Sequence, residues 1–110
     1  MRVDLNDIQT GAYAVLRDVP PWGLMRKVGK FVGKDSLTED ESSELQNLLL
    51  INMVKEWNVK DDDGNAVPLP RNSQEGQLDF VDGRIMARLL KESRTILDSV
   101  KVDPNSENAS

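Results

Sequence analysis

A leucine-rich segment in the middle of this 110-residue chain constrains its fold more than any other feature. The segment opens with a capping box, formed either by Ser36 with Glu39 or by Thr38 with Glu41. An apolar stripe follows at helical spacing: Leu45, Leu48, Leu49, Met53 and Trp57, broadened by Ile51 and Val54. The pattern predicts a helix over about residues 38–56, at the centre of the core.

The N-terminal residues predict a β-hairpin. Val3 and Leu5 alternate with polar neighbours, which is the period of a strand with one buried face. After Thr10-Gly11, residues 12–16 (AYAVL) form a second short apolar run. Two such runs around a glycine-containing loop are typical of two paired strands.

Pro20-Pro21 ends the hairpin and suits the first turn of a helix, where the missing N–H costs nothing. We expect a helix from about Trp22 to Val32, weakened by its glycines, with Trp22 and Met25 flanking its apolar face. This helix also carries the basic cluster of the chain: Arg26, Lys27, Lys30 and Lys34. These cations indicate either a solvated helix face or a docking patch for an acidic partner.

The last apolar pattern predicts a helix from about Asp79 to Val100, with Asp79 as its cap. Its expected apolar face comprises Phe80, Val81, Ile85, Met86, Leu89, Leu90, Ile96 and Leu97. Residues 101–110 are polar and predict a flexible tail. The chain therefore predicts one domain over residues 1–100, α+β but mainly α: a β-hairpin, three helices and a small β-turn excursion at 58–70.

The β-turn excursion contains the motif Asp61-Asp62-Asp63-Gly64-Asn65. A calcium loop of the EF-hand type starting at Asp61 needs glycine at its sixth position and glutamate at its twelfth. The chain has Ala66 and Asn72 there. Asp and Asn favour turns by bonding their own backbone, and glycine accepts positive φ. The motif predicts a sharp turn and no metal site, with weak adventitious calcium binding as the alternative.

Missing residue types exclude several classes of chemistry. The chain has neither cysteine nor histidine, which excludes disulfides, thiolate metal sites and histidine-dependent catalysis. No nucleophile stands near a base in the sequence, so we expect no catalytic residue, no cofactor and no enzymatic activity. The net charge of −5 argues against a nucleic-acid partner. No apolar run reaches the length of about 18 residues that a membrane span needs.

Two motifs and the order of the elements carry a family resemblance. One motif is the helix that ends in W-N-x-x-D-x-D-G-N-x-x-P-L-P, from Trp57 to Pro70, and the other is R-D-x-x-x-W-G, from Arg17 to Gly23. This pattern resembles the tail assembly chaperones of long-tailed bacteriophages and related prophages. The resemblance covers roughly residues 1–98.

The resemblance implies a non-enzymatic role in the cytoplasm of a host bacterium. Such chaperones bind the long, helical tape-measure protein, help to recruit tail tube subunits and are absent from the finished tail. One alternative is a phage structural protein, of the neck or tail-completion type, that stays in the virion. Another is a small acidic regulator of a host protein. A homo-oligomer is a further expectation, because leucine and methionine are numerous for so small a core.

Five residues are candidate protein-binding residues. Met25, Met53 and Met86 qualify because methionine adapts to varied partners. Leu50 lies off the main apolar stripe, and Trp57 belongs to the residue type most enriched at binding hot spots. Each of them equally suits the core, and Trp57 also suits a hinge between the central helix and the turn.

Overall fold

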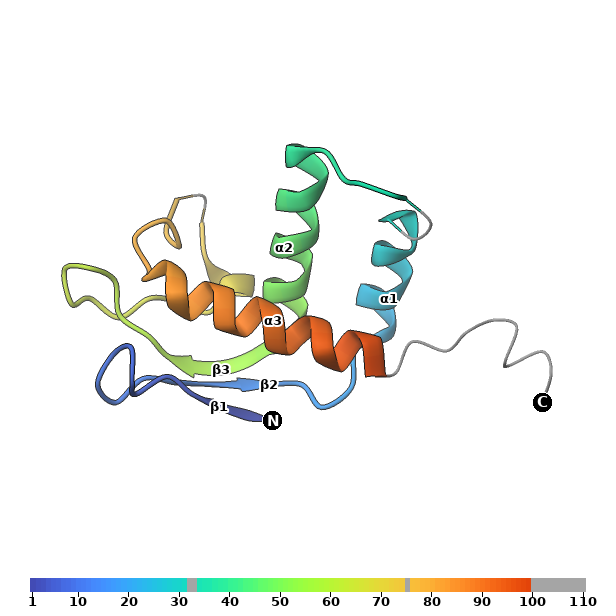
Figure 1. Cartoon of the computed structure of the whole chain (residues 1–110). Helices are drawn as coiled ribbons and strands as arrows, with labels where there is room; N and C mark the ends of the chain where they lie inside the picture. The colour runs from blue at the N-terminus through green and yellow to red at the C-terminus, as the bar shows by residue number, and fades with distance from the viewer. Residues whose placement is uncertain (32–33, 75, 100–110) are drawn as a thin grey trace.

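The computed structural model describes residues 1–31, 34–74 and 76–99 of the chain. Three strands form an antiparallel sheet in the order β1–β2–β3, and its members are β1 (Arg2–Asp4), β2 (Tyr13–Leu16) and β3 (Val54–Asn58). The helices are α1 (Trp22–Val28), α2 (Glu39–Met53) and α3 (Gly83–Ser99). Helix α3 runs alongside the sheet, whereas α1 and α2 stand side by side and point away from it (Figure 1). The α+β prediction is confirmed.

Strands β1 and β2 form the predicted hairpin. Val3 pairs with Ala14 in an antiparallel register, so both small apolar side chains are buried on the same face. In the connecting loop, the Gly11 amide donates a hydrogen bond of 2.8 Å to Asn6 Oδ1. Gly11 has a φ of 80°, a left-handed conformation that glycine adopts without steric cost. The hydrogen bond to Asn6 and the backbone conformation of Gly11 therefore stabilise the loop between the two strands.

Helix α2 starts as predicted but ends earlier. Of the two possible capping boxes, the one between Thr38 and Glu41 forms: each backbone amide donates to the other's side chain at 3.1 Å. The predicted end near residue 56 is wrong, because the helix stops at Met53. Val54 pairs with Leu16 and starts β3 with no connecting loop. The apolar period continues across this boundary, which is why the third strand was not predicted.

The two outer helices also differ from their predicted bounds. Helix α1 gives way at Val28 to a short 3-10 helix, η1 (Gly29–Phe31), and the predicted end at Val32 lies outside the described residues. Helix α3 begins at Gly83, where Asp82 Oδ1 accepts from the Arg84 amide at 2.9 Å. Asp82 therefore caps α3, and the prediction of Asp79 is wrong.

Phe80 departs from its predicted place on the apolar face of α3. It lies in the turn before the helix and its residue is 64% exposed. The predicted tail at 101–110 lies outside the residues that the structure describes.

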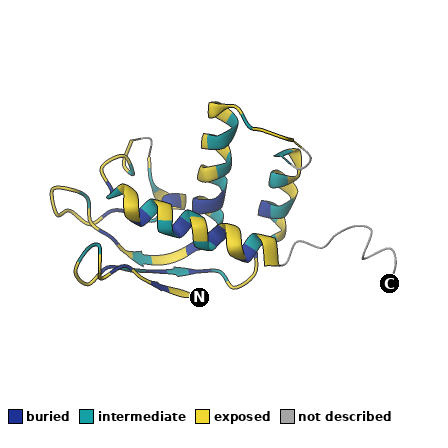
Figure 2. Cartoon of the chain, in the orientation of Figure 1, coloured by how far each residue is buried: buried dark blue, intermediate teal, exposed yellow. Residues whose placement is uncertain are grey.

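The core lies between the sheet and the three helices. Its largest fully buried side chains include Leu5, Leu16, Leu24, Leu49, Met53, Ile85 and Leu89. Buried residues gather in the half of α2 nearest the sheet, and the half nearest its N-terminus is half-buried or exposed (Figure 2). Helix α2 is therefore both the centre of the core and the element that projects furthest from it.

Candidate functional site

Two of the five candidate contact residues are core residues in this structure. Met53 is 0% exposed and offers no surface to a partner, because it sits where α2 meets the sheet. Leu50 is 4% exposed and lies at the floor of a surface hollow of about 290 Å³, beside the more exposed Ile51. Met25 and Met86 are half-buried, and their role in binding stays a prediction.

Trp57 connects β3 to the chain that returns after the turn. Its Nε1–H donates to the carbonyl oxygen of Val67 at 3.0 Å, and the Val67 amide donates to the carbonyl of Val59 at the same distance. Trp57 is half-buried and packs against the core. Trp57 therefore ties β3 to the returning segment and contributes to the core, while a hinge role and a contact role both remain predictions.

The Asp61–Asn65 motif forms the predicted turn. Asp61 Oδ1 accepts from the amides of Asp63 at 3.0 Å and Asn65 at 2.9 Å, and Gly64 has a φ of 84°. One carboxylate oxygen from each of Asp61, Asp62 and Asp63 lies within 4.8 Å of the others, the spacing of a cation site. One carboxylate oxygen of Asp61 already accepts hydrogen bonds from the backbone. Exposed acidic clusters are also common without an ion, so we assign no metal here.

Another hollow beside α2 is the α1–α2 groove. It has a volume of about 480 Å³ and is lined by Arg26, Lys27, Lys30, Glu44 and Leu48. Lys30 forms an ion pair with Glu44 across the groove. Within the described ranges, Arg26 and Lys27 make no ion pair. The groove thus combines a cationic wall on α1 with a leucine on α2.

A second ion pair also connects the α1 side of the groove to α2. Lys34, which follows η1, contacts the Glu41 carboxylate in the first turn of α2. The hydrogen bond from Lys34 is the main reason that the pKa of Glu41 is lowered. Because Glu41 also caps α2 through Thr38, one side chain both starts the helix and ties it to the segment after α1.

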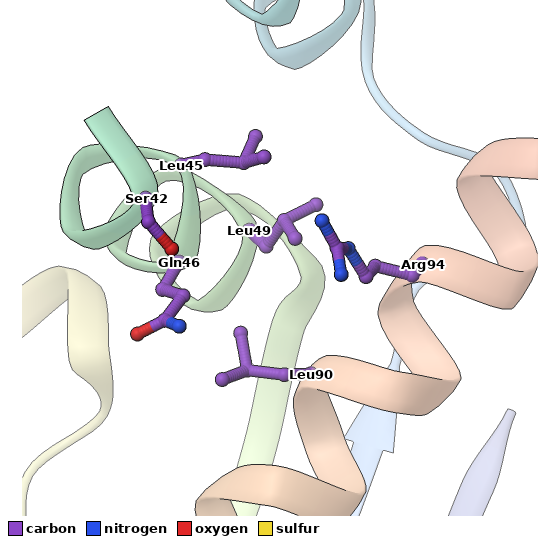
Figure 3. A pocket seen from close by; sticks show the side chains of 6 residues that line it. All are labelled: Ser42, Leu45, Gln46, Leu49, Leu90 and Arg94. Atoms are coloured by element: carbon purple, nitrogen blue, oxygen red, sulfur yellow. The ribbon is translucent and has the colours of Figure 1, made fainter. Parts of the chain in front are cut away.

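A further hollow lies between α2 and α3 and has a volume of about 70 Å³. Its lining residues are Ser42, Leu45, Gln46, Leu49, Leu90 and Arg94. Figure 3 shows Leu49, Leu90 and Arg94 converging from the two helices. Leu45 and Leu48 are three residues apart on α2, so this hollow and the α1–α2 groove open on neighbouring sides of the same helix.

The motif from Arg17 to Gly23 divides into a structural part and an exposed part. Asp18 accepts from the N-terminal amine at 2.6 Å, and Arg17 Nε donates to the Asn52 carbonyl at 2.9 Å, so both residues stabilise the fold. Trp22 is 74% exposed at the start of α1. The sequence placed Trp22 beside the apolar face of its helix, and its exposure was not foreseen.

One buried polar group has no partner within the described part of the chain. Ser93 of α3 is fully buried, and its Oγ accepts and donates no hydrogen bond there. It lies on the core side of α3 with Ile85, Leu89 and Ile96, which are all buried.

None of the described helices combines the length and the hydropathy that a bilayer crossing requires. No protein-family profile, curated protein or solved structure matches this chain.

Proposed function

We propose that this protein is a phage tail assembly chaperone, which binds helical segments of the tape-measure protein and helps to recruit tail tube subunits. The resemblance over Arg17–Gly23 and Trp57–Pro70 supports the family. The observation that carries the proposal is the projecting half of α2. There, Leu45 and Leu48 are half-buried: they pack against the core and also border two hollows.

Half-exposed leucines beside a groove suit the recognition of a helix. An amphipathic helix binds by laying its apolar stripe into such a groove, at spacings of three and four residues. A long helical protein that exposes such stripes before it assembles would be protected from aggregation by a partner that covers them. Binding alone accomplishes this, and no reaction is needed.

The experiment is co-expression of this chain with the long helical protein encoded downstream of it, followed by size-exclusion chromatography. We expect a joint peak, a partner that is insoluble when expressed alone, and no trace of this chain in purified particles. The test variant is Leu45→Gln with Leu48→Gln, which keeps side-chain length and helix propensity. The matched control is Val19→Gln, an exposed apolar residue that borders neither hollow.

The joint peak should weaken with the double variant and persist with the control. If this chain is instead found in purified particles without a joint peak, the neck or tail-completion function replaces the chaperone. If it neither co-purifies nor enters particles, both phage functions fail and the regulator of a host protein becomes the leading hypothesis.

A further inference from the structure

The charged side chains that line the two hollows beside Leu45 and Leu48 are mostly cations: Arg26, Lys27, Lys30 and Arg94, against the single carboxylate of Glu44. Glu44 is paired with Lys30, and Glu41 is paired with Lys34. Arg26 and Lys27 on α1, together with Arg94 on α3, are exposed and make no ion pair within the described residues. In a chain of net charge −5, the linings of these two hollows therefore carry an excess of positive charge, and the exposed carboxylates of Glu39 and Asp40 lie in the first turn of α2 and line neither hollow.

The same surface has an apolar floor. Leu45 and Leu48 come from α2 and Leu90 from α3, and all three are half-buried against the core. Figure 3 shows the Arg94 side chain extending from α3 toward Leu49 of α2, so this cation stands directly beside the leucines. Leucines flanked by cations match a partner that is apolar on one side and acidic at its edges.

We propose that this surface, called here the basic cradle (Arg26, Lys27, Leu45, Leu48, Leu90 and Arg94), binds an acidic amphipathic helix. The apolar stripe of that helix lies on the leucines, and its Asp or Glu side chains face the three cations. The inference rests on the proposed function for the helical nature of the occupant, and it adds the place of binding and the charge of the partner.

The shape and chemistry of the cradle favour a protein helix over other acidic partners. A nucleic-acid backbone needs clustered cations and gains nothing from a leucine floor. A flat bilayer surface cannot enter a groove of about 480 Å³ between two helices. An acidic helix satisfies both the leucines and the unpaired cations, because i, i+3 and i+4 spacings place its apolar and charged residues on adjoining faces.

The test uses two designed peptides that differ only in charge. Both carry leucine at the a and d positions of successive heptads; one has glutamate and the other lysine at the remaining charged positions, so that like-charge repulsion opposes self-association. Affinity for the full chain is measured by isothermal titration calorimetry at low and high salt. We expect the glutamate peptide to bind about tenfold more tightly at low salt, with a smaller preference at high salt.

Charge reversal then locates the site. The variant Arg26→Glu with Lys27→Glu should remove or invert the preference for the glutamate peptide. The matched control is Lys55→Glu with Arg71→Glu, whose residues are also exposed but line neither hollow, and it should keep the preference. Circular dichroism checks the fold of both. If the reversed variant does not fold, amide chemical shifts of the wild type with each peptide locate the contact.

Equal binding of the two peptides overturns the inference, as does a reversed variant that keeps the preference or shifts confined to residues outside the cradle. These outcomes are separate from those of the proposed function. A tape-measure protein that co-purifies equally well with the reversed variant leaves the chaperone standing and removes the cradle. If the cradle is charge-selective but the chain does not bind the tape-measure protein, the cradle stands and the chaperone function fails.

Discussion

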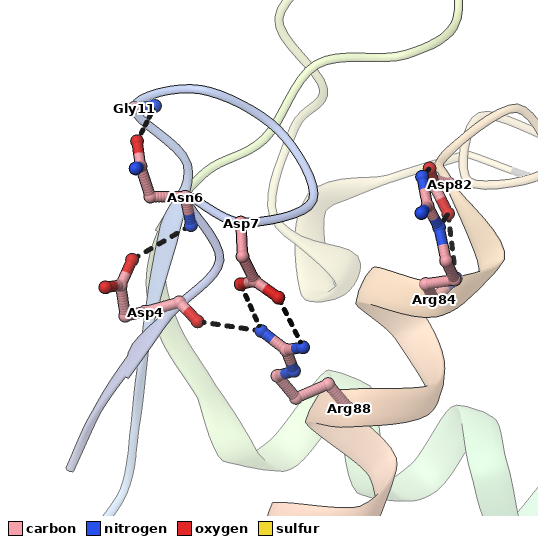
Figure 4. Close-up of polar contacts among 7 residues, drawn as sticks. All are labelled: Asp4, Asn6, Asp7, Gly11, Asp82, Arg84 and Arg88. Atoms are coloured by element: carbon pink, nitrogen blue, oxygen red, sulfur yellow. Dashed lines mark hydrogen bonds and ion pairs between the residues drawn. The ribbon is translucent and has the colours of Figure 1, made fainter.

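Arg88 of α3 and Asp7 of the loop between β1 and β2 form a two-pronged ion pair. Nη1 lies 2.6 Å from Oδ1 and Nη2 lies 2.9 Å from Oδ2 (Figure 4). The same Nη1 donates to the carbonyl oxygen of Asp4 at 3.1 Å. A single guanidinium therefore holds the N-terminal hairpin against the C-terminal helix.

This ion pair predicts how stability depends on pH. The hydrogen bond from Arg88, followed by its charge, lowers the pKa of Asp7 below its ordinary value of 3.8. The folded state then binds this proton less readily than the unfolded state, so the contribution is complete above the ordinary pKa and is lost as pH falls through the lowered one. We expect Arg88→Gln to be less stable near neutral pH and to lose less of its stability during acidification.

The measurement is denaturant unfolding at a series of pH values from about 7 down to about 2, the window in which paired carboxylates titrate. Arg71→Gln is the control, because Arg71 is exposed and makes no ion pair within the described residues. Its curve should run parallel to that of the wild type. Parallel curves for Arg88→Gln as well would mean that the pair contributes nothing.

Met53 and Met25 should respond differently to truncation. Met53 is fully buried where α2 becomes β3, so Met53→Ala leaves a cavity and should cost about 2–5 kcal/mol of unfolding free energy. Met25 is half-buried on α1, and Met25→Ala should cost clearly less. Equilibrium urea unfolding measures both. Equal and small losses would show that Met53 is not held in the core.

Local signals in the sequence predicted the starts of elements better than their ends. The capping box between Thr38 and Glu41 needs only residues within one turn, so it was visible without the fold. The switch from helix to strand at Val54 has no glycine or proline to mark it. The switch is set by the pairing of Val54 with Leu16, 38 positions earlier in the chain. The spacing of apolar residues within one segment cannot predict such a long-range pairing.

In the candidate site, too, the sequence predicted some features and only the three-dimensional packing determined others. Residue type and spacing identified the leucines of α2, but only the packing decides which of them stay half-exposed beside a hollow. Met53 and Leu50 were selected as contacts and are buried, whereas Trp22 was assigned next to an apolar face and is exposed. The cations of α1 were noted as a docking patch or a solvated face, and their position beside Leu48 became apparent only with α1 and α2 in place.

Gly64 should tolerate a side chain less well than Gly29. A methyl group at Gly64 would meet no atom within 4 Å, but its φ of 84° strains any residue with a Cβ, so Gly64→Ala should cost about 1 kcal/mol. Gly29 is right-handed helical and also has open space, so Gly29→Ala should stabilise by about 0.5 kcal/mol. Thermal unfolding of the two variants gives the signs. A neutral Gly64→Ala would mean that the turn changes its conformation easily.

The two tryptophans should differ in their contribution to stability. Trp57→Phe keeps an aromatic ring but removes the donor to the Val67 carbonyl, and the loss should be about 1 kcal/mol. Trp22→Phe changes a residue that is 74% exposed and should alter stability by less than about 0.5 kcal/mol. Guanidinium unfolding followed by far-UV circular dichroism compares them without relying on tryptophan fluorescence. A larger effect at Trp22 would contradict the exposed position.

Ser93 is the position where removing a polar group should help. Its hydroxyl is fully buried and has no hydrogen-bond partner among the described residues. Folding therefore removes this group from water, and no hydrogen bond within the protein compensates for that desolvation. Alanine removes that cost and is the better helix former, so Ser93→Ala should raise the unfolding free energy by about 1 kcal/mol. Ser73→Ala is the contrasting variant, because Ser73 Oγ donates to the Pro70 carbonyl at 2.8 Å and its loss should destabilise. Both are measured by urea unfolding at one pH. If Ser93→Ala instead destabilises as much as Ser73→Ala does, the Ser93 hydroxyl makes a hydrogen bond in solution, and the interior of α3 is more polar than its leucines and isoleucines imply.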